Sequence, residues 1–150
     1  MKEWIEHIVR GPVPAALVLS FLFTTIGVKF APAEDESGEP VFYETGALVP
    51  DEGQNIKAHV VGAHRTASVH HLVVTERVAA HHHKTHDETV IILGGEGNMT
   101  IDSETRKVRA GDVLMIPRGT VHSFDVTEAP AEAVSVFSPP FDGEDRHFVD

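Results

Sequence analysis

From Val41 onward, the chain consists of short segments rich in Val, Ile, Thr and Phe, separated by closely spaced turn signals. Such segments are typical of β-strands in an antiparallel barrel or sandwich. Glycine-rich or polar stretches predict hairpin turns at 94–97, 102–103 and 110–112. No stretch after residue 41 sustains the apolar period of a helix. The sequence therefore predicts an all-β fold, an antiparallel barrel or jelly roll of about eight strands. The expected strands are residues 57–61, 68–74, 89–93, 97–101, 105–108, 113–116, 122–126 and 133–138.

The segment HHHKTHDE at residues 81–88 concentrates candidate metal ligands. Alternate residues of a strand point to the same face, so His81 and His83 can both reach one ion while His82 points away. Glu88 follows after enough residues for a turn, and the start of the next strand can bring its carboxylate back toward that ion. We therefore expect two imidazoles and one carboxylate to converge on one site.

A second segment, residues 111–122, ends in a histidine that is distant in sequence from the first group. Gly111 makes a turn before an apolar strand, Pro117 and Gly119 shape another tight turn, and His122 opens the next strand. Three imidazoles and one carboxylate without sulfur suit Mn, Fe, Ni, Co, Cu or Zn. With four protein ligands, an octahedral ion keeps adjacent positions open for a substrate, or for a substrate and O₂.

The first segment resembles the first motif of the cupin superfamily, G-(x)5-H-x-H-(x)3,4-E-(x)6-G. The matching residues are His81, His83, Glu88 and Gly95, and Thr75 stands where the motif begins with glycine. This departure does not touch a ligand position.

The second segment resembles the second cupin motif, G-(x)5-P-x-G-(x)2-H-(x)3-N. Here Gly111, Pro117, Gly119 and His122 match, and Val126 stands where the motif ends with asparagine. The resemblance extends from about residue 57 to 138 and implies a small cupin barrel, a double-stranded β-helix that binds one divalent transition metal. It also implies a small-molecule substrate and a homodimer. By resemblance, the metal ligands are His81, His83, Glu88 and His122.

The roles of several neighbouring residues stay open. Glu88 is either a ligand or a group that stands off from the ion and acts as a general base. His86 is either a proton shuttle or substrate contact in the cavity, or an exposed turn residue. Arg118 either binds a substrate carboxylate or is solvated. His70 and His71 face opposite sides of one predicted strand, and either could line the cavity. Apolar residues expected in the pocket wall or the core are Met99, Ile101, Phe124 and Val136.

The first 33 residues differ from the rest of the chain. Lys2 and Arg10 precede a nearly all-apolar run at 13–28, and Ala-Pro-Ala follows at 31–33. This order is typical of a secretory signal peptide, which predicts cleavage after Ala33 and a periplasmic or secreted protein. The apolar run is short for a membrane span, which needs about 20 residues. An uncleaved membrane anchor through residues 13–28 and a buried helix are the alternatives.

We divide the chain into a signal peptide or anchor at 1–33, a linker and N-terminal extension at 34–56, and the barrel with its C-terminal tail at 57–150. The sequence has 12 Lys and Arg against 23 Asp and Glu, which gives a net charge of −11. This acidic balance argues against nucleic-acid partners, whose phosphates require a basic face. The chain has no Cys, which excludes disulfides, thiolate zinc sites and Cys nucleophiles.

Two functions are compatible with these features. The first is a metal-dependent enzyme that acts on a small oxygen-bearing molecule, with dioxygenase-like chemistry expected ahead of decarboxylation or isomerisation. In that case Glu88 is the candidate base and His86 its partner. The alternative is a non-catalytic extracytoplasmic module that binds a small molecule or a metal, because few other acid–base groups accompany the ligand set.

Overall fold

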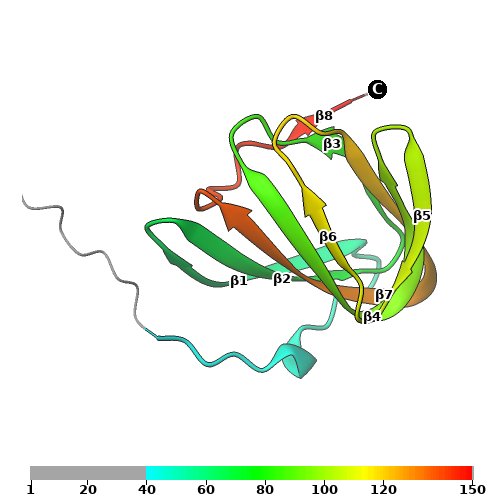
Figure 1. The fold of residues 1–150 in the computed structure, drawn as a ribbon. Helices are drawn as coiled ribbons and strands as arrows, with labels where there is room; N and C mark the ends of the chain where they lie inside the picture. Colours follow the sequence, from blue (N-terminus) through cyan, green and yellow to red (C-terminus); the bar gives the residue numbers. More distant parts are fainter. Residues whose placement is uncertain (1–39, 150) are drawn as a thin grey trace, which may run out of the picture. The chain divides into compact units, whose positions relative to one another are not determined.

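The structure, a computed structural model, describes residues 40–149, and these residues form an all-β barrel (Figure 1). The elements are the 3-10 helix η1 (Thr45–Ala47) and the strands β1 (Ile56–His64), β2 (Ala67–Val74), β3 (Arg77–His82), β4 (Asp87–Ile101), β5 (Glu104–Arg109), β6 (Val113–Ile116), β7 (His122–Ser138) and β8 (His147–Phe148). The predicted signal peptide or anchor lies outside the described residues. Within 40–149, no helix is long and apolar enough to cross a bilayer.

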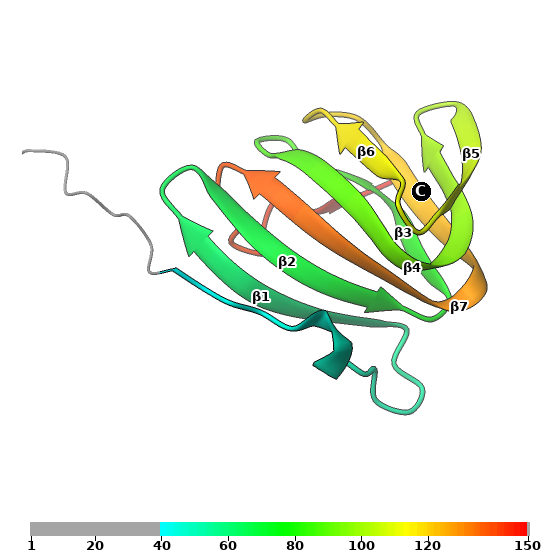
Figure 2. The same cartoon turned by 60° about the horizontal axis from the view of Figure 1, so that its bottom comes forward.

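The strands pair antiparallel throughout, as predicted for a jelly roll. β7 is the central strand and pairs with β2, β3 and β4, while β4 also pairs with β5 and β6. Figures 1 and 2 show β4 and β7 side by side along the barrel, with the β1–β2 hairpin continuing the sheet beyond β7. Two long strands thus connect the outer parts of the sheet.

β4 bends where the sequence predicts a turn. The hairpin turn expected at 94–97 is wrong, because β4 continues through these residues and stays paired with β7. Three irregularities in register between Ile92 and Gly97 give the bend, as β-bulges do. Gly95 has φ +70°, and a Cβ there would lie 2.5 Å from the carbonyl oxygen of Pro130, so only glycine fits this position. Because of this bend, the single strand β4 can belong to both sides of the barrel.

Two other strands differ from their predicted limits. Residues 127–132, which separate the predicted strands 122–126 and 133–138, lie inside β7. Residues 77–82 form β3, which was not among the predicted strands, although His81 was expected on one. In both cases pairing across the barrel supplies the hydrogen bonds, and local sequence patterns do not record such long-range pairing.

The core occupies the inside of the barrel. Alternate residues of β4 are buried, and Val90 and Ile92 contribute to this core. Glu88 belongs to the same alternating series, so its carboxylate also faces inward. The barrel therefore has an apolar interior that gives way to polar groups near the start of β4. The core consists of Val90, Ile92, Met99, Val108, Ile116, Phe124 and Ala131.

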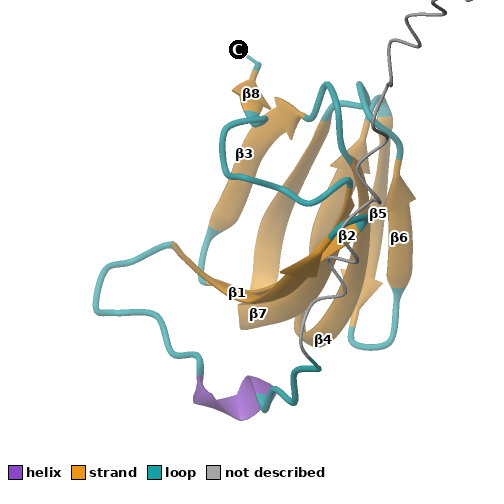
Figure 3. Cartoon of the chain, turned by 90° about the vertical axis from the view of Figure 1, so that its left-hand side faces the viewer, coloured by secondary structure: helices purple, strands orange, loops and turns teal. Residues whose placement is uncertain are grey.

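The N-terminal extension packs on the outer face of the sheet. Figure 3 shows η1 and its flanking loops outside the strands. The hydroxyl of Tyr43 lies 2.9 Å from Nδ1 of His71, whose Nε2 lies 2.8 Å from Oε1 of Glu132. The carboxylate can only accept, so Nε2 of His71 carries the proton and Nδ1 accepts from the tyrosine. His71 is fully buried, so it anchors the extension and does not line the cavity.

Candidate metal centre

Four residues predicted as metal ligands come together at one end of the barrel. One nitrogen or oxygen atom from each of His81, His83, Glu88 and His122 lies within 4.8 Å of the corresponding atoms of the others. All four side chains are buried, with exposures of 2–8%. His81 is in β3, His83 directly follows β3, Glu88 is the second residue of β4, and His122 opens β7. Residues far apart in sequence thus form one compact cluster.

Strand register explains most of this convergence. His81 pairs directly with His122 in the β3–β7 ladder, and their ring centroids are 4.2 Å apart. The turn before β7 closes with a hydrogen bond from the N–H of Thr120 to the carbonyl of Pro117, at 3.1 Å. Gly119, with φ +83°, donates its N–H to the carbonyl of His83 at 2.6 Å. The turn of one motif is therefore bonded directly to the other motif.

The three imidazoles are held in one tautomer by backbone carbonyls. Nδ1 of His81 lies 2.8 Å from the carbonyl oxygen of Ala79, and Nδ1 of His122 lies 3.1 Å from that of Thr120. Nδ1 of His83 is bonded to the carbonyl of Asp145. A carbonyl can only accept, so each Nδ1 carries the proton and each neutral ring leaves a lone pair on Nε2. Fixing the ring through its second nitrogen is the usual arrangement for a histidine that binds metal.

The atoms that face the centre of the cluster lack hydrogen-bond partners. These are Nε2 of His83, Nε2 of His122 and Oε2 of Glu88, all buried. Oε2 of Glu88 is 3.1 Å from Nε2 of His122 and 3.6 Å from Nε2 of His83, but neither contact has hydrogen-bond geometry. Leaving three such atoms unsatisfied is costly unless a cation lies among them. The donor set therefore fits a divalent transition metal.

The surroundings of His81 and Glu88 favour the protonation states that bind a metal. The pKa of His81 is lowered to about 4. Burial is the largest cause and nearby positive charges add to it, while the hydrogen bond to the carbonyl of Ala79 opposes it. Burial alone would raise the pKa of Glu88, but the imidazoles of His122 and His83 bring it below its ordinary value. At neutral pH the site therefore presents a neutral imidazole at His81 and a carboxylate at Glu88.

His86 is buried beside this cluster but does not belong to it. Its Nδ1 lies 2.6 Å from Oδ2 of Asp145, and its Nε2 lies 3.2 Å from the carbonyl oxygen of Pro140. The alternative of an exposed turn residue is therefore wrong, because the C-terminal segment, residues 139–149, covers this loop. The predicted role of His86 in proton transfer stays a prediction.

Sequence reasoning missed Asp145, which connects the C-terminal segment to the loop after β3. Its carboxylate accepts hydrogen bonds from the backbone N–H groups of Lys84 and Thr85, at 2.9 and 2.8 Å. It also accepts bonds from the Thr85 hydroxyl at 2.7 Å and from His86 at 2.6 Å. Burial raises the pKa of Asp145, but these bonds outweigh that effect and lower it. No local pattern around Asp145 predicts this role, because its partners are about 60 residues away in sequence.

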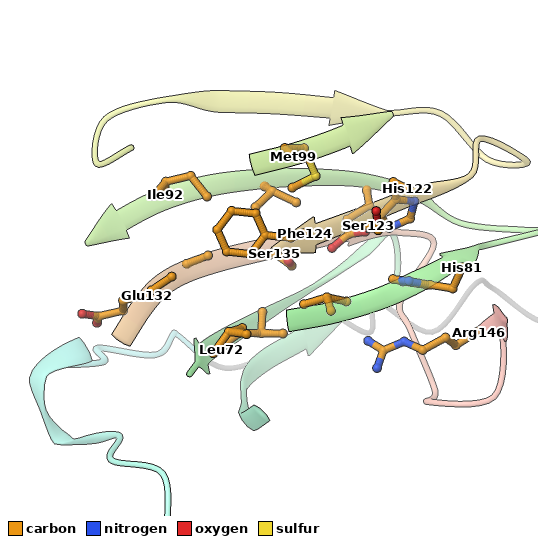
Figure 4. Close-up of a pocket in the computed structure, with 16 residues that line it drawn as sticks. Leu72, His81, Ile92, Met99, His122, Ser123, Phe124, Glu132, Ser135 and Arg146 are labelled. Carbon is orange, nitrogen blue, oxygen red and sulfur yellow. Dashed lines mark ion pairs between the residues drawn. The ribbon is translucent and has the colours of Figure 1, made fainter. Parts of the chain in front are cut away.

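A cavity adjoins the cluster inside the barrel (Figure 4). His81, Glu88 and His122 line it on one side, and mostly apolar residues line the rest. Of the residues expected in its wall, Met99 and Phe124 are present, while Ile101 and Val136 are not among those that line it. The apolar lining residues are Leu72, Val74, Val78, Val90, Ile92, Met99, Phe124, Ala131 and Ala133.

Two other predicted candidates lie elsewhere. The guanidinium of Arg118 is exposed and bonded to Asp87, with Nη2 2.6 Å from Oδ2, so it is not directed at a substrate. His70 is buried on the inner side of β2 and bonded to Ser68 at 2.9 Å, with its ring against Phe137. A different arginine, Arg146 of the C-terminal segment, lines the cavity, and sequence analysis did not single it out.

Comparison with known proteins agrees with this fold. A family model described as "Cupin domain" matches residues 68–137. An uncharacterized protein of Aquifex aeolicus is 28% identical over 120 residues, which cover 79% of this chain and 94% of that protein. Quercetin 2,3-dioxygenase of Bacillus subtilis is 33% identical over 64 residues, which cover 43% of this chain but only 19% of the dioxygenase.

Solved structures share the architecture. The structure of KdgF from Halomonas sp. aligns with a TM-score of 0.62 at 20% identity, covering 69% of this chain and 97% of that one. At this identity the likeness concerns the fold. The antiparallel barrel, the two motifs joined at one cluster of ligands and the family match together show that this chain contains a cupin domain, matched over residues 68–137.

Proposed function

We propose that this cupin binds one divalent transition metal through His81, His83, Glu88 and His122, and that the loaded protein is an enzyme with dioxygenase-like activity on a small oxygen-bearing molecule. The observation that carries the proposal is the set of three imidazoles whose Nδ1 atoms are bonded to carbonyls, with Nε2 of His83 and of His122 unpaired beside one buried carboxylate. The ion could be Fe, Mn, Ni, Cu, Co or Zn, because this ligand set suits all of them.

The ion would supply Lewis acidity and, if redox-active, reactivity toward O₂. The protein would supply a water-poor, apolar cavity that orients a substrate against the open side of the cluster. Glu88 would accept a proton from the bound substrate when its carboxylate stands off from the ion. His86 would pass or hold a proton through its bond to Asp145, whose carbonyl also positions His83. The partial match to quercetin 2,3-dioxygenase supports an oxygenase among the chemistries of this family.

The test is turnover by protein loaded in turn with each of the six ions. The candidate substrates are catechols, flavonols, diketones, thiols and oxalate. O₂ consumption and product formation are measured for each of them. We expect one ion and one substrate class to give turnover that Glu88→Gln lowers by about 10²-fold or more, the usual size of a general-base contribution. The absence of turnover with every ion would contradict the enzyme proposal.

A non-catalytic binding module is the second candidate. It is favoured by the shortage of acid–base groups in the cavity: the carboxylates among its described lining residues are Glu88 and Glu132, and Glu132 is bonded to His71. Calorimetry that detects a tightly bound small molecule, together with its unchanged recovery after incubation, would support this function over catalysis.

We also propose that the barrel works outside the cytoplasm as a homodimer. The support for the location is the charged, apolar and Ala-Pro-Ala order of residues 1–33. Fractionation of expressing bacteria, with mass determination of the exported form, tests cleavage after Ala33 against retention in the membrane. Light scattering of the purified protein tests the dimer.

A further inference from the structure

Arg146 reaches the cavity from the C-terminal segment. It lies between Asp145, which bonds this segment to the loop after β3, and β8. Figure 4 shows its guanidinium directed toward the cavity from the side of His81. It lines the same cavity as Glu88 and His122. A permanent positive charge therefore stands close to the candidate metal centre.

This guanidinium has no protein partner among residues 40–149. Its Nε is buried without a hydrogen bond, and none of the ion pairs between described residues involves it. Arg106 and Arg118, by contrast, pair with Glu104 and Asp87, both at 2.6 Å. Arg146 as a whole is half-buried, so its charge is partly removed from water. A charge removed from water without a counter-charge costs free energy, and arginine cannot lose its proton to avoid that cost.

The neighbouring residue Asp145 and the two carboxylates that line the cavity with Arg146 already have other partners. The carboxylate of Asp145 accepts bonds from backbone and side chains of the loop after β3. Oε1 of Glu132 is bonded to His71, and Glu88 faces His122 and His83. A divalent ion at the cluster would leave the cavity with a net positive charge, because the ion and Arg146 together carry three positive charges against the two carboxylates of Glu88 and Glu132.

We propose that Arg146 binds the carboxylate of a small, largely apolar acid, which is the substrate or ligand of this cavity. A guanidinium presents parallel N–H donors that match the two oxygens of a carboxylate. The apolar wall, with Leu72, Val90, Ile92 and Phe124, suits the carbon skeleton of such an acid better than it suits a strongly hydrated phosphate or a sugar. This rests on the proposed function in that the acid would lie against the metal centre, but the ion pair with Arg146 does not itself require the metal.

The electrostatic reach of Arg146 supports this placement. Burial lowers the pKa of His70, Glu88 opposes the effect, and the charge of Arg146 lowers the pKa further. Arg146 is also among the charges that lower the pKa of His81, after burial. His70 lies on β2 and His81 on β3, so the guanidinium is close enough to act on side chains of two strands.

The experiment measures binding of matched ligands by calorimetry to the full-length chain, both zinc-loaded and chelator-treated. The probes are 3-phenylpropanoate, its neutral amide and phenethyl phosphate. We expect the carboxylate to bind at least 10-fold more tightly than the amide in both forms of the protein. Arg146→Met should abolish that preference by weakening the binding of the acid more than the binding of the amide, while Arg146→Lys should keep part of it. Arg106→Met, an exposed arginine outside the cavity, is the matched control and should behave like the parent.

Equal affinity for acid and amide, no binding of the acid, or an unchanged preference in Arg146→Met would overturn the proposal. A stronger preference for the phosphate would overturn the carboxylate assignment. Elemental analysis of the same samples keeps the two proposals separate. A carboxylate preference that persists without metal supports the role of Arg146 even if the protein binds no transition metal, whereas metal binding with no such preference supports the metal centre alone.

Discussion

The carbonyl of His83 accepts a hydrogen bond from the backbone N–H of Gly119 at 2.6 Å. His83 belongs to the first histidine segment and Gly119 to the turn that precedes His122, so this bond joins the two halves of the candidate metal centre. The carbonyl of Asp145 holds the ring of the same histidine from a third direction. The position of His83 thus depends on contacts from both the second motif and the C-terminal segment.

Metal binding should stabilise the folded protein. An ion that binds only the native state at about 100 times its Kd adds about 2.7 kcal/mol. Chelation should therefore lower the Tm measured by calorimetry, and re-addition of metal should restore it. His81→Ala should remove this difference, whereas His64→Ala, an exposed histidine of β1, should not. An unchanged Tm after chelation of verified holo protein would contradict metal binding at this cluster.

Asp145 should control metal affinity without contacting the ion. Its carboxylate holds the C-terminal segment on the loop after β3, and its carbonyl orients His83. Replacement of groups that orient a ligand typically lowers metal affinity by about 10- to 100-fold. We expect Asp145→Ala to show a loss in this range in a competition titration with a chromogenic chelator.

The control for Asp145 is Asp142→Ala in the same segment, because Asp142 is exposed and its side chain bonds the backbone of Glu144 and no other group within residues 40–149. If both variants bind metal as tightly as the parent, the C-terminal segment does not position His83 in solution.

Gly95→Ala should destabilise the barrel strongly. The position combines φ +70° with a Cβ that would lie 2.5 Å from the carbonyl oxygen of Pro130, so backbone must move at the bend of β4. We expect a loss of about 2 kcal/mol or more in the free energy of unfolding, measured in urea.

Gly111→Ala separates backbone strain from steric clash. Gly111 also has a positive φ, +95°, but a Cβ there would meet nothing within 4 Å. Its substitution should cost only the left-handed conformation, about 1 kcal/mol. Equal losses for the two glycines would mean that the close approach of β7 to the bend does not matter for stability.

The metal-free protein should lose stability as the pH falls from about 6.5 to about 4. An unfolded histidine has a pKa near 6.5, whereas the pKa of His81 in the fold is lowered to about 4. Between these values the unfolded chain binds a proton that the native chain does not, so the free energy of unfolding falls with pH and levels off below about 4. Each pKa unit is about 1.4 kcal/mol, so His81 contributes up to about 3 kcal/mol.

Denaturant titrations at several pH values on chelated protein measure this effect. His81→Gln should flatten the decrease, and His64→Gln, whose ring is exposed, should not. A free energy of unfolding that does not change over this range would contradict a lowered pKa at His81.

Sequence patterns predicted the ligand cluster and the fold class well, because both depend on spacing. The i, i+2 spacing of His81 and His83, the turn before Glu88 and the glycine turn before His122 restrict where these side chains can point. Alternating apolar residues likewise predicted most of the strands. The same local signals misled at 94–97, where glycines that usually make a hairpin turn instead make a bend inside β4.

The amino-acid sequence by itself determined that this chain is a β-barrel and which four side chains could meet around an ion, since alternation and turn chemistry are local properties. Only the tertiary structure brought the carbonyl of Asp145 to His83 and the side chain of Arg146 to the cavity. It also paired Arg118 with Asp87, outside the cavity. The physical reason is that the C-terminal segment is positioned by hydrogen bonds to the loop after β3, about 60 residues earlier in the chain. Such partners carry no periodic or local pattern, so their roles follow only from where the folded backbone brings them.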